Sequence, residues 1–105
     1  MATKLALLQG QEQIIADIKE LVDNGKPVGY LFKDPHRISA EKDFLAETPQ
    51  DRKVHVTLAP WILLSADNEI LVPKNQVVTI VEPIDSVKKM YSEKLNGSDG
   101  ISTDE

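Results

Sequence analysis

Turn-forming residues divide this chain into short apolar segments, a spacing that suits strands joined by tight turns. Asp23-Asn24-Gly25 is the strongest turn signal, because asparagine and glycine accept the positive φ angles that tight hairpins require. Gly10 and Asp67-Asn68 interrupt apolar runs in the same way. The strands expected between these turns are 4–8, 12–22, 27–33, 53–66 and 69–81.

The segment from Glu12 to Val22 fits two patterns. Its aliphatic residues fall on one face of a helix, and they also nearly alternate as a strand requires. Periodicity alone favours the helix. Three isoleucines favour the strand, because β-branched side chains lose χ1 freedom in a helix and suit a pleated surface. We expect a strand, and the isoleucines concerned are Ile14, Ile15 and Ile18.

Asp34-Pro35 is expected to end the strand at 27–33. Proline has no amide hydrogen, so it cannot donate to a strand ladder. The polar, charged segment 37–52 that follows is expected to be a surface loop. Long loops in compact domains are often functional or mobile.

The last two expected strands, 53–66 and 69–81, are each interrupted by a proline, Pro60 and Pro73. We expect them to pair as a strongly bent hairpin, since prolines in strands accompany bends and bulges. The apolar run 61–64 is expected to be covered on both faces. Bent strands of this kind are how a small sheet closes on itself.

A helix is expected after the strands, with Pro83 in its first turn and Gly97 as its stop, the positions that these two residues favour. Its apolar stripe would be Ile84, Val87, Tyr91 and Leu95, with Met90 beside it. The remaining residues, 98–105, are expected to form a disordered acidic tail. Residues 1–97 would then form one domain.

Composition limits the class of protein. The 105 residues suffice for a single core. The absence of cysteine excludes disulfides, thiolate zinc sites and cysteine nucleophiles. No apolar run is long enough for a membrane helix, so we expect a cytoplasmic protein that does not bind membranes. The net charge is −5, and much of the excess lies in the tail, which leaves the body nearly neutral.

Catalytic and metal-binding patterns are not found. No serine lies in a glycine-flanked nucleophile elbow, and there is no glycine-rich phosphate loop. His36 and His55 could pair on a metal, but no third ligand has suitable spacing. We therefore expect a binding protein rather than an enzyme, without a cofactor, a metal or a small-molecule substrate.

Two stretches resemble the Sm/LSm family of small barrels. In 5–18, an apolar strand and a glycine turn precede a strand with Ala16 where the family usually has glycine. In 70–80, Pro73-Lys74 stands where the family usually has an arginine–glycine pair. Pro60-Trp61 and the C-terminal helix are similar to Sm-like proteins of T4-type marine phages, including cyanophages.

The resemblance implies a five-stranded, strongly bent antiparallel barrel of the SH3-like kind, followed by the helix. It also implies a ring of identical subunits in which the last strand of each copy pairs with its neighbour. The interface residues would then be Val77, Val78 and Ile80. If the chain is phage-encoded, the ring would act in the host cytoplasm, in phage-related RNA metabolism.

Single-stranded RNA is the ligand that the resemblance implies, held by two loops. The candidate contacts are Lys33, Asp34, His36 and Arg37 in the first loop and Lys74 and Asn75 in the second. An ordinary solvated turn is the simpler interpretation of the first loop, and a kinked hairpin with an exposed lysine explains the second equally well. Trp61 is expected in the core or an interface, and His55 on the solvent side of its strand.

A second hypothesis keeps the barrel but changes the partner. The nearly neutral body, the acidic tail and the missing arginine–glycine pair would also suit a phage structural or adaptor module that binds protein and no nucleic acid.

Overall fold

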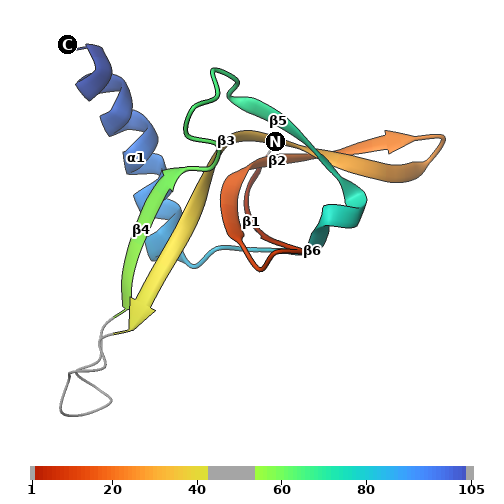
Figure 1. The fold of residues 1–105 in the computed structure, drawn as a ribbon, viewed down its shortest axis with the longest axis horizontal. Coiled ribbons are helices and arrows are strands. Elements are labelled where there is room, and N and C mark those ends of the chain that lie inside the picture. The colour runs from red at the N-terminus through yellow and green to blue at the C-terminus, as the bar shows by residue number, and fades with distance from the viewer. Residues whose placement is uncertain (1, 43–53, 104–105) are drawn as a thin grey trace.

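The computed structural model describes residues 2–42 and 54–103. These residues form one antiparallel sheet of six strands and one C-terminal helix, so the prediction of a mostly β protein with a final helix is confirmed (Figure 1). The elements are β1 (Ala2–Leu8), β2 (Gln13–Asp23), β3 (Lys26–Lys42), β4 (Val54–Pro60), β5 (Glu69–Pro73), the 3₁₀ turn η2 (Lys74–Gln76), β6 (Val77–Val81) and α1 (Asp85–Thr103).

The sheet curls strongly but does not close. Its strand order is β4-β3-β2-β1-β6, and β5 pairs with β3. The turn η2 joins β5 to β6 (Figure 1), and these two strands are not paired in the described sheet. The architecture observed is therefore an open, curled sheet of six strands rather than the closed five-stranded barrel expected.

The strand prediction for 12–22 is confirmed by β2. Ile14, Ile15 and Ala16 are all completely buried although they are consecutive, so both faces of β2 are covered. The turn prediction at Asp23-Asn24-Gly25 is also confirmed, with positive φ at Asn24 (54°) and Gly25 (79°).

Asp34-Pro35 does not end β3, and that prediction was wrong. Between the pairs Ile15↔His36 and Asp17↔Lys33, one residue of β2 faces two residues of β3, which is a β-bulge. Asp34 takes a left-handed φ of 52°, and Pro35 occupies the bulge, where no ladder hydrogen is required of it. The strand continues to Lys42, so the first part of the predicted loop 37–52 is strand, and 43–52 lies outside the described residues.

The predicted hairpin of 53–66 with 69–81 was also wrong. Instead, β4 and β5 follow one another along the same edge of β3, β4 against 36–42 and β5 against 29–33. The segment 61–68 forms turns between them, and β6 pairs with β1 on the other side of the sheet. Ile62, Leu63 and Leu64 are 49%, 72% and 95% exposed, so this apolar run is not covered on both faces.

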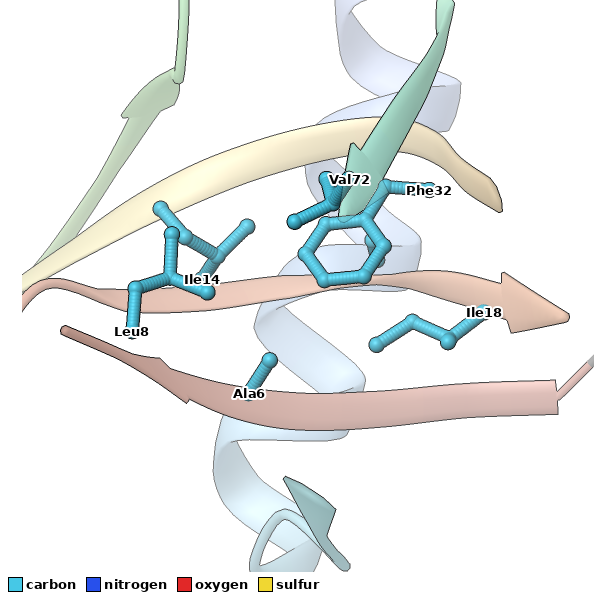
Figure 2. Close-up of a cluster of buried hydrophobic side chains, with 7 residues drawn as sticks. Ala6, Leu8, Ile14, Ile18, Phe32 and Val72 are labelled. Atoms are coloured by element: carbon cyan, nitrogen blue, oxygen red, sulfur yellow. The ribbon is translucent and has the colours of Figure 1, made fainter. Parts of the chain in front are cut away.

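Two hydrophobic clusters cover the two faces of the sheet. The inner cluster lies inside the curl, where Figure 2 shows Ile14, Ile18 and Val72 grouped around the ring of Phe32. Trp61 packs partly buried against it, with its ring 6.2 Å from that of Phe32. The outer cluster lies between the sheet and α1 and consists of Ile15, Leu58, Val87 and Tyr91.

The helix differs from its prediction at both ends. Ile84, the first residue of the predicted stripe, is 69% exposed, while Val87 and Tyr91 are buried as expected. At the other end α1 continues past Gly97 to Thr103, over most of the predicted tail. A single glycine costs a helix only about 1 kcal/mol relative to alanine, so Gly97 alone does not stop it.

Candidate functional site

The first predicted RNA loop is a junction between β3 and α1. The Tyr91 hydroxyl shares its one hydrogen between the carbonyl oxygens of Lys33 (3.2 Å) and Asp34 (3.0 Å). The carbonyl of Pro35 accepts a hydrogen bond from the amide of Trp61 at 3.0 Å. Three consecutive carbonyls beside the bulge thus accept hydrogen bonds from side chain and backbone donors outside β2.

His36 belongs to this junction. Its Nδ1 lies 2.9 Å from the Asp34 carbonyl oxygen, and because a carbonyl only accepts, Nδ1 carries the hydrogen. Its ring meets that of Tyr91 edge-on at 5.7 Å, and the residue is only 8% exposed. In this arrangement the ring is not accessible for stacking on a base.

The electrostatics of the junction keep Tyr91 protonated. Burial raises the pKa of the Tyr91 hydroxyl well above its usual range, and the negative charges of Asp17 and Asp34 raise it further. The hydroxyl therefore keeps its hydrogen, and remains a donor, to a higher pH than an ordinary tyrosine does. Asp34 is additionally fixed through its amide, which donates to the Asn68 carbonyl at 2.6 Å.

The second predicted loop is η2, where Lys74 and Asn75 are both exposed. It is not next to the first loop. Lys33 pairs with Glu69 at one end of the β3–β5 ladder, and Gly29 pairs with Pro73 at the other. Four residue steps of a strand separate these ends, which is about 14 Å. The structure therefore does not bring the two predicted loops together.

Arg37 lies elsewhere, in a polar groove. The groove forms where β2 begins, because β3 extends past the first residue of β2. Gln13 opens β2 opposite Ile38, and from Ser39 onward β3 is paired only with β4 among the described strands. The groove has a volume of about 480 Å³. Its lining residues are Gln11, Glu12, Gln13, Arg37, Ile38, Ser39, Ala40, His55 and Thr57.

The turn between β1 and β2 holds one wall of this polar groove in place. The Leu8 amide donates to the Glu12 carbonyl, and the Gln11 amide donates to the Leu8 carbonyl, both at 2.9 Å. Gln11 takes a positive φ of 67°. These bonds fix the backbone of the turn, so that three consecutive polar residues line the groove.

The polar side chains on the floor of the groove lie on one face of β3 and β4. Ser39 and Thr57 are direct cross-strand neighbours. Arg37 and His55 each lie two residues before them in their own strands, on the same face. Because β3 and β4 are antiparallel, Arg37 and His55 lie on opposite sides of the Ser39–Thr57 pair. All four are exposed. The prediction that His55 faces solvent is confirmed.

Sequence reasoning found Arg37 but missed the rest of the groove. Two signals were present: an uninterrupted polar run, 11–13, directly after the Gly10 turn, and the alternation of polar His55 and Thr57 with apolar neighbours. They could not be combined without knowing that β3 continues through the bulge to lie between the β1–β2 turn and β4.

The predicted interface residues lie on β6. Val78 is 55% exposed, whereas Val77 and Ile80 pack partly buried against the inner cluster. One edge of β6 is paired with β1, and in the described part of the chain no strand covers its other edge. The outer edges of β4 and β5 are likewise without a strand partner there.

The described residues contain neither a metal-binding cluster nor a membrane-spanning helix. Within 2–42 and 54–103, no three histidine or acidic side chains gather closely enough to hold a metal ion. Over the same residues, the helix is not long and apolar enough to cross a membrane.

Comparison with known proteins places the chain in a family. No curated protein matches the sequence. A protein-family model described as "Family of unknown function (DUF6561)" matches residues 1–96. Since that match spans most of the 105 residues, the chain belongs to this family of unknown function.

Proposed function

We propose that this chain is a self-assembling, Sm-like binding protein that forms a ring of identical subunits and holds single-stranded RNA. The observation that carries the proposal is the open sheet. Its β6 edge at one end and its β4 and β5 edges at the other are unpaired in the described structure. Pairing the β6 of one copy with the opposite edge of the next is a head-to-tail contact, which closes into a ring if the rotation permits.

Exposed aliphatic side chains support assembly at these edges. Leu71 on β5 is 65% exposed, and Val78 and Val81 on β6 are 55% and 46% exposed. Exposed aliphatic residues on strands with an unpaired edge suit an interface between copies. Unprotected sheet edges otherwise invite aggregation, so pairing between copies would both cover the apolar residues and satisfy the free backbone groups.

The barrel belongs to the same proposal. The sheet already curls around the inner cluster, and η2 links β5 to β6 where closure would occur. The resemblance of 5–18 and 70–80 to the Sm-like motifs supports treating this curl as a small barrel completed by its neighbours.

For RNA, the proposal relies on groups that a ring would repeat around its circumference. Lys74 and Asn75 are exposed on η2, and Arg37 is exposed in the polar groove. Each subunit brings only Arg37 and Lys74 as cations to the proposed contact, but linking several weak sites multiplies the affinity for one strand. His36 is not part of the proposed contact, because it is buried in the junction.

The test is to disrupt the edge and measure mass and binding together. We expect light scattering to give several subunits for the intact protein, and the variant Val78→Asp to give one subunit with weakened binding of short fluorescent RNA. Val22→Asp is the matched control, because Val22 is equally exposed (56%) near the β2–β3 turn, away from β6. A monomeric intact protein would contradict the ring, and assembly without salt-dependent RNA binding would contradict the RNA ligand.

A second candidate function, a protein-binding adaptor, is favoured by the exposed loop of Ile62, Leu63 and Leu64. Three adjacent exposed aliphatic residues suit a protein partner better than RNA. The variant Leu63→Ser with Leu64→Ser should then lose partners that survive nuclease treatment in a pull-down. If those partners are unchanged, the loop is not the contact.

A further inference from the structure

The polar groove has the size and chemistry of a site for one small polar unit. Its volume of about 480 Å³ lies within the range of small-ligand sites, about 300–1,000 Å³. It lies at a step in the sheet, bounded by the β1–β2 turn on one side and by β3 and β4 on the other. A ligand there would meet side chains from three separate elements.

One wall carries groups that read the edge of a nucleobase. Glu12 offers a carboxylate, which only accepts hydrogen bonds, between the amides of Gln11 and Gln13, which both donate and accept. Glutamine pairs with the amino group and ring nitrogen of adenine, and glutamate accepts from the amino group of cytosine. The wall is therefore rich in acceptors for an exocyclic amino group.

The floor supplies the groups that would hold the remainder of a nucleotide. Arg37 is a permanent cation with the fork geometry that suits phosphate, and His55 is an exposed ring on which a base can stack. Ser39 and Thr57, directly opposite each other between these two, offer hydroxyls to a ribose or base. The guanidinium, the imidazole ring and the two hydroxyls thus lie on one exposed face of the sheet.

We propose that the polar groove binds one nucleotide of a single-stranded RNA and selects a base that carries an amino group. Glu12 and its glutamine neighbours form hydrogen bonds with the base edge, His55 stacks on the base, and Arg37 contacts the phosphate. This inference rests on the proposed RNA-binding function and adds a site and a specificity to it. Uracil has no amino group: its pairing edge offers one ring N–H donor, and the carbonyl oxygens on both sides of that donor would face the acceptor carboxylate of Glu12. Uridine-rich RNA is therefore the weaker ligand of this groove.

The first experiment compares short oligoadenylate, oligocytidylate and oligouridylate by fluorescence polarisation on the intact protein. We expect adenylate or cytidylate to bind about tenfold more tightly than uridylate, the lower part of the range for one good base contact. Equal affinities, or a preference for uridylate, would overturn the inference.

Variants then assign the preference to the groove. Glu12→Gln replaces an acceptor with a group that also donates, so the ratio of adenylate to uridylate affinity should fall to about threefold or less. His55→Ala should weaken binding of every oligonucleotide about tenfold, and His55→Phe should restore it by keeping a stacking ring. Arg37→Gln should weaken all three oligonucleotides and lower the salt dependence.

Controls separate this inference from the proposed function. Lys89→Gln removes an exposed cation on α1, outside the groove, and should leave affinity and preference unchanged. If no oligonucleotide binds the intact protein, the proposed function fails and the inference with it. If RNA binds and only Lys74→Gln weakens it, while Glu12→Gln, Arg37→Gln and His55→Ala do not, the function stands and the groove is not its site. Circular dichroism of each variant excludes misfolding as the cause.

Discussion

The two sides of β2 are held by different kinds of structure. On the inner side, strands of the curled sheet bury aliphatic residues around Phe32. On the outer side, Ile15 packs under α1 beside a polar junction, in which Tyr91 and His36 form hydrogen bonds with carbonyls beside the bulge. The inner cluster depends mainly on apolar packing of strands, whereas the outer one also needs hydrogen bonds between elements far apart in the sequence.

The largest expected effect comes from adjacent residues that point to opposite sides. Ile14→Ala and Ile15→Ala remove the same atoms from completely buried positions, so each should cost about 2–5 kcal/mol of the free energy of unfolding. The two variants should differ in which part of the molecule loses protection from exchange. Hydrogen exchange should show α1 opening first in Ile15→Ala, and the whole sheet losing protection in Ile14→Ala.

That comparison fails if the two variants expose the same amides at the same rates. In that case the two clusters would unfold as one cooperative unit, and α1 would be no more separable from the sheet than any strand.

The next effect concerns the pairing of β5 with β3. A Cβ added at Gly29 would lie 2.9 Å from the carbonyl oxygen of Val72, so Gly29→Ala must push the two backbones apart. We expect a loss of about 1–3 kcal/mol by urea denaturation. Gly97→Ala is the control, because it meets nothing within 4 Å in α1 and should be neutral or slightly stabilising. Equal stability of the two variants would contradict the close approach.

A smaller effect is expected from the junction alone. Tyr91→Phe keeps the ring against His36 and removes the hydroxyl that donates to Lys33 and Asp34. The Asp34 carbonyl keeps its hydrogen bond from His36, so the Lys33 carbonyl is the acceptor that loses its Tyr91 donor. An acceptor left unsatisfied costs about 1–3 kcal/mol, and hydrogen exchange should report this loss mainly in α1. An unchanged exchange rate in α1 would show that the hydroxyl does not hold the helix.

The last predicted effect, on the pH dependence of stability, appears only at alkaline pH. Burial raises the pKa of Tyr91, so the folded chain holds this proton to a higher pH than the unfolded chain does. Its contribution is full below the ordinary tyrosine pKa of about 10 and declines as the pH rises above that value. Stability should therefore fall more steeply above pH ~10 in the intact protein than in Tyr91→Phe. Parallel curves would contradict this.

The inner side of the molecule could largely be predicted from the sequence. Alternation and isoleucine content identified β2, and asparagine with glycine identified the turn that follows it. These signals are local, because a strand face and a tight turn depend on residues a few positions apart.

The outer side of the molecule could not be predicted in this way, because the contacts that form it join residues far apart in the sequence. Pro35 usually ends a strand, but a bulge opposite Ala16 accommodates it and lets β3 continue. That continuation places Arg37 in the polar groove and buries His36 under a tyrosine from the far end of the chain. No nearby residue signals either placement, so the site was predicted at Arg37 alone among the groove residues.

The most direct test of the account measures mass and RNA on the same particle. Intact protein is mixed with short labelled oligoadenylate and followed by size-exclusion chromatography with light scattering. The account predicts one peak that contains several subunits together with the label, and a reduced label when oligouridylate is used. A peak with the mass of one subunit and a separate peak of free RNA would contradict both the ring and its ligand.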